Sequence, residues 1–237
     1  MQYEIDILAF GAHADDVEIG MGGTIAKYAT TGKSIVICDL TQAEMSSNGT
    51  VETRMIEAKQ AGDILGIQER VNTYLPDRGL LMKEEYIARI AAIIRKYKPK
   101  LVFAPYIVDR HPDHGNSAKL VEEAVFSSGV RKYVDEQEQA PHRVEAMYYY
   151  MINGYHKPHF VVDVSNTIDD KIKSLQAYNS QFESTDTSYK TPLVDDYIES
   201  IVAREKMIGK EVGVSYAEGF FTKKPILLSN DLIGEVK

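Results

Sequence analysis

The chain has 237 residues, of which 44% are hydrophobic and 26% charged, and its formal net charge is −8. That length suits one large domain over 1–237 with a full hydrophobic core. The negative charge argues against general binding to nucleic acid or to anionic membranes. No apolar run approaches the ~18 residues of a membrane span. The N-terminus has no signal-peptide pattern, so we expect a cytoplasmic protein.

Short apolar runs alternate with helical patterns over the first two thirds of the chain. The expected strands are 4–10, 34–40, 71–75 and 101–105. The expected helices are 52–66, a helix that ends before Pro99, and 115–133. Continuous apolar strands suit a parallel sheet that is buried on both faces. The alternation therefore predicts a right-handed, Rossmann-like three-layer α/β/α fold with a mainly parallel sheet.

After residue 144 the pattern is less regular. Strands are expected at 147–151 and 160–164, followed by a helix that Ser165 or Asn166 caps and that reaches Phe182. Residues 184–192 are polar and rich in turn formers, which predicts a surface loop. A helix over roughly 195–210 and a short C-terminal strand complete the chain. No linker divides it.

Two clusters of metal-ligand residue types each follow a predicted strand. His13, Asp15 and Asp16 come directly after the first strand, and His111 and His114 follow the fourth. Doubly wound sheets bind ligands beyond the carboxyl ends of their strands, where the strand order reverses. With the order 3-2-1-4-5 that point lies between the first and fourth strands. Either cluster alone could be an ordinary polar loop, but together they predict one metal site.

The ligand types favour a catalytic zinc site. Imidazole nitrogen and carboxylate oxygen suit zinc, and three protein ligands with an open fourth position are typical of catalysis. Because adjacent side chains rarely serve one ion, we assign His13, Asp16 and His114 as the ligands. Such sites also accept Fe²⁺ or Co²⁺.

The remaining polar side chains predict acid–base chemistry. Asp15 is the expected general base, and a protonated His111, oriented by Asp113, is the expected donor to a tetrahedral oxyanion. A cation held beside them would lower the pKa of water to about 7 and polarise a carbonyl. This combination suits amide hydrolysis.

A nucleotide-binding oxidoreductase that uses NAD(P) is the main alternative. Gly20, Gly22 and Gly23 lie near the start of the first helix, and Asp39 closes the second strand. However, Ile25 occupies the last glycine position of the fingerprint, and two carboxylates at the first turn would repel a pyrophosphate. The glycines are instead expected to permit close helix packing. A non-catalytic metal-binding or scaffold protein is a third possibility, but it leaves the spare acid–base residues without a use.

The two clusters resemble a known family. His13-Ala-Asp-Asp16 and His111-Pro-Asp-His114 are similar to the motifs of the LmbE/PIG-L-type zinc-dependent N-deacetylases. The resemblance implies one Zn²⁺ per subunit on His13, Asp16 and His114, with Asp15 as the base and His111 as the oxyanion donor.

Further segments resemble the branch of that family that makes bacillithiol. They are 39–41, 47–49, 76–79, 153–154, 181–182 and 217–219. This branch implies N-acetylglucosaminyl-L-malate as the small-molecule substrate, a homohexamer, and no nucleic-acid or membrane partner. Related enzymes act instead on chitooligosaccharide ends, on inositol-linked glucosamine or on thiol conjugates.

The resemblance also suggests four substrate-binding residues. Arg54 could bond sugar hydroxyls or the carbonyl end of the substrate, or form a surface salt bridge with Glu57 or Glu52. Arg110 could face the malate carboxylates, since a guanidinium recognises them bidentately. Arg143 is expected to reach the pocket of a neighbouring subunit. Tyr197 is expected to contact the substrate from the mobile loop that precedes this residue in the chain.

Overall fold

A seven-stranded sheet forms the middle layer of the computed structural model, which describes residues 4–184, 188–194 and 196–227. The strand order is β3-β2-β1-β4-β5-β7-β6. The first five of these strands are parallel, whereas β7 runs antiparallel to both β5 and β6. The strands are β1 Ile7–Gly11, β2 Ile35–Asp39, β3 Glu69–Asn72, β4 Leu101–Pro105, β5 Ala146–Tyr150, β6 Phe160–Asp163 and β7 Ala217–Phe221. The predicted order 3-2-1-4-5 is confirmed.

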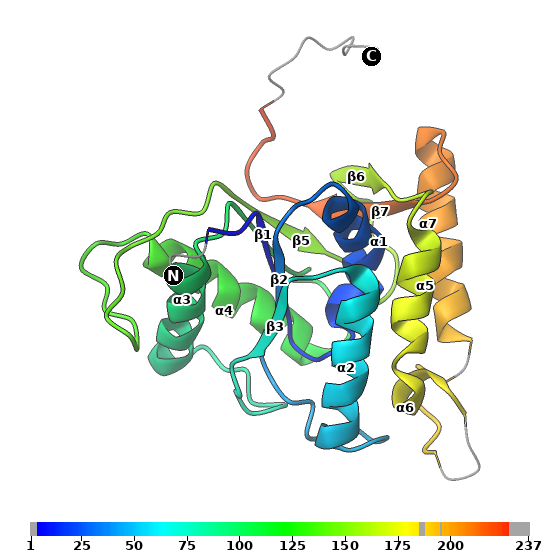
Figure 1. Ribbon diagram of the computed structural model, residues 1–237, viewed down its shortest axis with the longest axis horizontal. Helices are drawn as coiled ribbons and strands as arrows, with labels where there is room; N and C mark the ends of the chain where they lie inside the picture. The colour runs from blue at the N-terminus through cyan, green and yellow to red at the C-terminus, as the bar shows by residue number, and fades with distance from the viewer. Residues whose placement is uncertain (1–3, 185–187, 195, 228–237) are drawn as a thin grey trace.

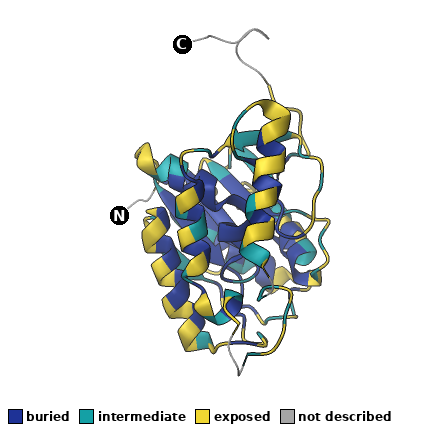
Figure 2. Ribbon diagram, turned by 90° about the vertical axis from the view of Figure 1, so that its right-hand side faces the viewer, coloured by how far each residue is buried: buried dark blue, intermediate teal, exposed yellow. Residues whose placement is uncertain are grey.

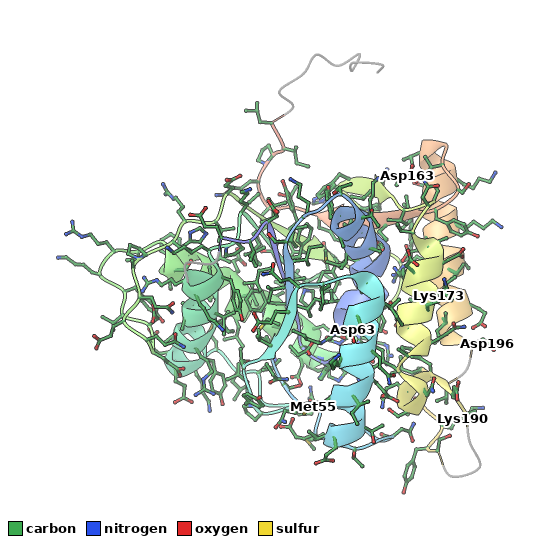
Figure 3. All side chains as sticks on the ribbon, viewed as in Figure 1. Met55, Asp63, Asp163, Lys173, Lys190 and Asp196 are labelled. Atoms are coloured by element: carbon green, nitrogen blue, oxygen red, sulfur yellow. The ribbon has the colours of Figure 1, made fainter. Side chains whose placement is uncertain are left out.

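Helices cover both faces of the sheet, which confirms the three-layer fold (Figure 1). α3 and α4 pack on one face, and α1, α2, α5 and α7 pack on the other. The helices are α1 Asp16–Thr30, α2 Val51–Leu65, α3 Glu84–Tyr97, α4 Pro112–Ser128, α5 Ile168–Gln176, α6 Asn179–Phe182 and α7 Tyr197–Val212. Figure 2 shows buried strands between helices whose outer sides are exposed. In Figure 3, Lys173 marks the outer side of α5 and Asp196 the start of α7.

Local sequence explains both boundaries of α2 and the buried face of α3. Thr50 accepts a hydrogen bond from the amide of Thr53 at the start of α2, and Gly66 ends that helix in the left-handed conformation. α3 buries Ile87, Ile90 and Ile94 at helical spacing against the sheet. No helix in the described part of the chain is long and apolar enough to cross a membrane.

Several predicted boundaries are wrong. β3 covers 69–72 rather than 71–75, and Tyr74, just beyond it, has a positive φ that a regular strand does not adopt. α4 begins at Pro112 rather than 115, since proline suits the first turn of a helix. The residue before α5 is Thr167, so neither Ser165 nor Asn166 is the cap. The helix expected to reach Phe182 ends at Gln176, and the short α6 follows it.

The glycines of α1 serve packing, as expected. A Cβ on Gly20 would lie 2.0 Å from Cδ2 of Tyr150, and one on Gly23 would lie 2.9 Å from Cβ of Val164. They lie inside α1, which begins at Asp16, rather than in the turn after β1 where a dinucleotide fingerprint would be.

Candidate active site

The two predicted clusters meet at the carboxyl ends of β1 and β4, which are neighbours in the sheet. The ring centroids of His13, His111 and His114 lie 4.8 to 5.6 Å apart. One ligand atom from each of these three histidines falls within 4.8 Å of the others. The predicted meeting of the loops after β1 and β4 is confirmed.

His114 is oriented by a carboxylate that the sequence reasoning did not single out. Its Nδ1 lies 2.9 Å from Asp109, which leaves Nε2 facing Asp16 at 3.2 Å. Asn153 and the amide of His111 donate to the same Asp109 carboxylate. Burial lowers the pKa of His114, but Asp16 and Asp109 outweigh it and raise that pKa to about 9. A histidine that binds a metal through one ring nitrogen usually donates a hydrogen bond from the other nitrogen to a carboxylate or carbonyl.

His13 is surrounded by carboxylates. Its Nδ1 lies 3.6 Å from Asp16, and its Nε2 lies 3.1 Å from Asp77 and 3.8 Å from Asp113. Among the described residues, His13, Asp77 and Asp113 form a second group with metal-ligand spacing. The Asp16 carboxylate faces both His13 and His114. Neither of the two described groups with metal-ligand spacing includes Asp16, so the expected ligand set of His13, Asp16 and His114 stays a prediction.

Asp15 has the surroundings of a general base. It precedes α1 with a φ of 111°, a conformation that costs energy in a residue with a Cβ. Its side chain is buried, and its Oδ2 lies 2.9 Å from Nη2 of Arg54. Burial raises the pKa of Asp15 to about 7, against the opposing charge of Arg54. A carboxyl with that pKa can both take and return a proton near neutrality.

Arg54 is committed mainly to the backbone beside Asp15. Its Nε and Nη2 donate to the carbonyl of Ala14 at 3.0 and 2.8 Å, and its Nη1 donates to Ser46. The alternative salt bridge with Glu57 or Glu52 is wrong, because the carboxylate paired with Arg54 is Asp15, and Glu57 accepts hydrogen bonds from Ser180. Arg54 therefore holds the strained turn that presents Asp15.

The orientation expected for His111 is not what the structure shows. The backbone amide of Asp113 donates to Nδ1 of His111, while the Asp113 carboxylate accepts from Arg78. An imidazole that accepts at Nδ1 carries its proton on Nε2. Burial lowers the pKa of His111, as do the neighbouring His13 and His114. A neutral ring that carries its proton on Nε2 is still a hydrogen-bond donor.

A cavity of about 230 Å³ opens over this cluster. Three of the four expected substrate-binding residues, Arg54, Arg110 and Tyr197, line it. The Tyr197 hydroxyl donates to Asn153 at 3.1 Å. Arg143 lines a different cavity, beside Tyr148, so the structure does not bring it to this site. Its expected role in a neighbouring subunit stays a prediction.

Comparison with known proteins agrees with this geometry. Residues 8–125 match the family described as PIG-L, GlcNAc-PI de-N-acetylase. A diacetylchitobiose deacetylase of Thermococcus kodakarensis is 30% identical over 226 residues, which cover 90% of this chain and 81% of the relative. The chain belongs to the PIG-L family. Its enzyme class is therefore hydrolytic N-deacetylase, and its relatives act on compounds that contain N-acetylglucosamine.

Two further matches bear on the substrate and on the fold. A probable N-acetyl-α-D-glucosaminyl L-malate deacetylase of Bacillus anthracis is 27% identical, over 85% of this chain and 92% of the relative. The crystal structure of a conserved Thermus thermophilus protein has a TM-score of 0.87 and 38% identity, and it covers 94% of this chain and 97% of that one. These matches extend the likeness well beyond the two motifs.

Proposed function

We propose that this PIG-L family member is a zinc-dependent deacetylase of N-acetylglucosaminyl-L-malate. The observation that carries the proposal is the position of the buried Asp15, held by Arg54 beside a cluster of three histidines and several carboxylates. His13, Asp16 and His114 would hold the cation, because Asp109 turns Nε2 of His114 toward Asp16. When bound, the cation would activate water and polarise the acetyl carbonyl.

The side chains supply the proton transfers of the hydrolysis. Asp15 takes a proton from the attacking water as its oxygen bonds to the acetyl carbon. As the C–N bond breaks, Asp15 returns that proton to the departing nitrogen. The Nε2–H of His111 donates to the developing oxyanion. Arg54 holds Asp15 in place through the Ala14 carbonyl.

Cationic groups at the cavity support an anionic aglycone. Arg78 and Arg110 line the cavity, and both residues are exposed. Two carboxylates on malate suit two guanidinium groups better than the neutral second sugar of a chitobiose does. The name of the Bacillus anthracis relative supports the same substrate.

Acetate release tests the substrate. Zinc-loaded protein is incubated with N-acetylglucosaminyl-L-malate, with diacetylchitobiose and with an acetylglucosaminyl-inositol. We expect kcat/KM to be highest for the malate conjugate, and Arg110→Gln to raise KM for that compound alone. Equal or faster turnover of diacetylchitobiose would refute the proposed aglycone.

Two substitutions test the chemistry. Asp15→Ala should retain zinc but lose most turnover, whereas His114→Ala should lose the metal. A chelator that left activity intact would refute the mechanism, and loading with Fe²⁺ or Co²⁺ compares the alternative ions.

The assembly belongs to the same proposal. We expect a cytoplasmic homohexamer that works on a small molecule without a nucleic-acid or membrane partner. The molar mass in solution, from light scattering, tests the hexamer.

A further inference from the structure

Helix α1 is broken directly behind the site. Met21 has φ −150° and ψ 22°, which are not helical values. In a regular helix the amide of Gly23 donates to the carbonyl of Ile19. At this break the Gly23 amide donates to Glu218 at 2.9 Å, and the Ile19 carbonyl accepts from Arg204 at 3.2 Å. Two side chains from other elements thus bond the backbone groups on either side of the break.

Glu218 and Arg204 belong to a buried charge cluster, completed by Lys171 and Glu205. Lys171 Nζ lies 2.7 Å from both Glu205 and Glu218, and Arg204 lies 2.9 Å from Glu205. No member is more than 7% exposed. Two cations balance two anions, so loss of any one member leaves a buried charge without its partner.

The glycines of α1 make room for this cluster. A Cβ on Gly22 would lie 3.2 Å from Cγ of Lys171, and one on Gly23 would lie 3.3 Å from Oε1 of Glu218. The backbone amide of Thr24, next in the helix, also donates to Glu218, at 2.7 Å. The glycines of α1, which resemble a weak dinucleotide-binding fingerprint, therefore pack against the buried charge cluster.

The same cluster reaches both halves of the active site. The segment of α1 before the break begins at Asp16 and follows Asp15 directly. Arg204 also donates to the carbonyl of Ile152 at 2.8 Å. The next residue, Asn153, holds the Asp109 carboxylate that orients His114. One guanidinium therefore bonds the backbone that carries Asp16 and the backbone that supports His114.

We infer that Lys171, Arg204, Glu205 and Glu218 are positioning residues for the deacetylase, which fix Asp16 relative to His114. This inference rests on the proposed function. Their effect is indirect, because none of them lines the cavity above the site. Misplacement of a reacting group by about 1 Å can cost on the order of a hundredfold in rate, so a small shift of the short segment matters.

Arg204→Lys tests the inference against a matched control, Arg95→Lys. Arg95 is another buried arginine, paired with Asp135 at 2.7 Å and bonded to the carbonyls of Ser128 and Val130. It belongs to α3, on the opposite face of the sheet from α1 and α7. Both substitutions keep a charge and lose a guanidinium fork.

Zn²⁺ affinity, measured by competition with a chromophoric chelator, is the main readout. We expect Arg204→Lys to weaken it by about tenfold or more and to lower kcat of the zinc-saturated enzyme with little change in KM. Arg95→Lys should lower Tm but keep the affinity within about twofold. A folded Arg204→Lys variant with unchanged affinity and kcat would overturn the inference, as would equal losses in both variants.

Two glycine substitutions that leave the charges in place test the same inference if Arg204→Lys does not fold. Gly22→Ala crowds Lys171, whereas Gly129→Ala meets nothing closer than 3.6 Å. Only Gly22→Ala should weaken Zn²⁺ binding, and an unchanged affinity would reject the positioning role. The affinity readout needs no substrate. Failure to hydrolyse any acetylglucosamine compound would thus refute the proposed function, but the Zn²⁺ affinities of the variants could still be compared.

Discussion

Arg54→Lys separates positioning of the base from recognition of the sugar. The guanidinium makes three bonds to the turn that presents Asp15: two to the carbonyl of Ala14 and one to the Asp15 carboxylate. A lysine ammonium is a point charge without the planar fork, so it cannot reproduce this pattern. Hydrogen bonds that involve a charged group contribute about 1.5–3 kcal/mol each. Loss of about 2.7 kcal/mol from the transition state alone corresponds to roughly a hundredfold in kcat.

Steady-state kinetics with the preferred substrate measure the outcome. We expect kcat of Arg54→Lys to fall by one to two orders of magnitude, with KM changed by less than about threefold. Arg95→Lys is the control, because Arg95 is also a buried arginine paired with an aspartate, Asp135, away from the site. A large rise in KM with kcat unchanged would refute the positioning role and support the expected contact with sugar hydroxyls.

Three further substitutions test the support of the site and of the fold. Asp109→Asn should weaken Zn²⁺ affinity by about 10–100-fold, because the His114 imidazole loses the carboxylate that orients it. Calorimetry measures this affinity, and an unchanged value would contradict the prediction. The ion pair with Arg95 helps to lower the pKa of Asp135. Asp135 thus stabilises the fold above its unfolded pKa of about 3.9, and this stability is lost as the pH falls through its lowered folded pKa. The Tm gap between wild type and Asp135→Asn should therefore shrink with acid, and a gap independent of pH would contradict the assignment. Gly20→Ala should destabilise the protein by at least about 1–3 kcal/mol, seen by urea unfolding, since its Cβ would overlap the buried ring of Tyr150; wild-type stability would show that α1 can move.

The sequence predicted the meeting of the two clusters because topology alone decides it. Ligand types that directly follow β1 and β4 must share one edge when those strands are neighbours in a parallel sheet. Asp77 had no such signal, because it is a single carboxylate in the loop after β3, and only the folded chain brings it to His13. Asp109 lies in the loop that follows β4, but its pairing with Nδ1 of His114 appears only in the structure.

The pairing of Arg54 with Asp15 also lay beyond the sequence. The two residues are 39 positions apart, and α2 must pack beside α1 before the guanidinium reaches the turn. The position of Glu218 in the sequence, by contrast, does indicate a buried ion pair. A charged residue inside the apolar strand Ala217–Phe221 has to find a buried partner, and the cations of α5 and α7 were the candidates.

Charge balance distinguishes the buried charge cluster from the active site. The buried charge cluster sets two cations against two anions and is neutral by itself. The active site gathers more carboxylates than arginines, and His13 and His114 complete the balance, because the carboxylates that face them outweigh burial and raise their pKa values. The carboxylates are Asp15, Asp16, Asp77, Asp109 and Asp113, and the arginines are Arg54, Arg78 and Arg110. Burying charges that lack partners is costly. A divalent cation would offset about two negative charges at that point, so a bound cation would take over the balance that the two protonated imidazoles otherwise supply.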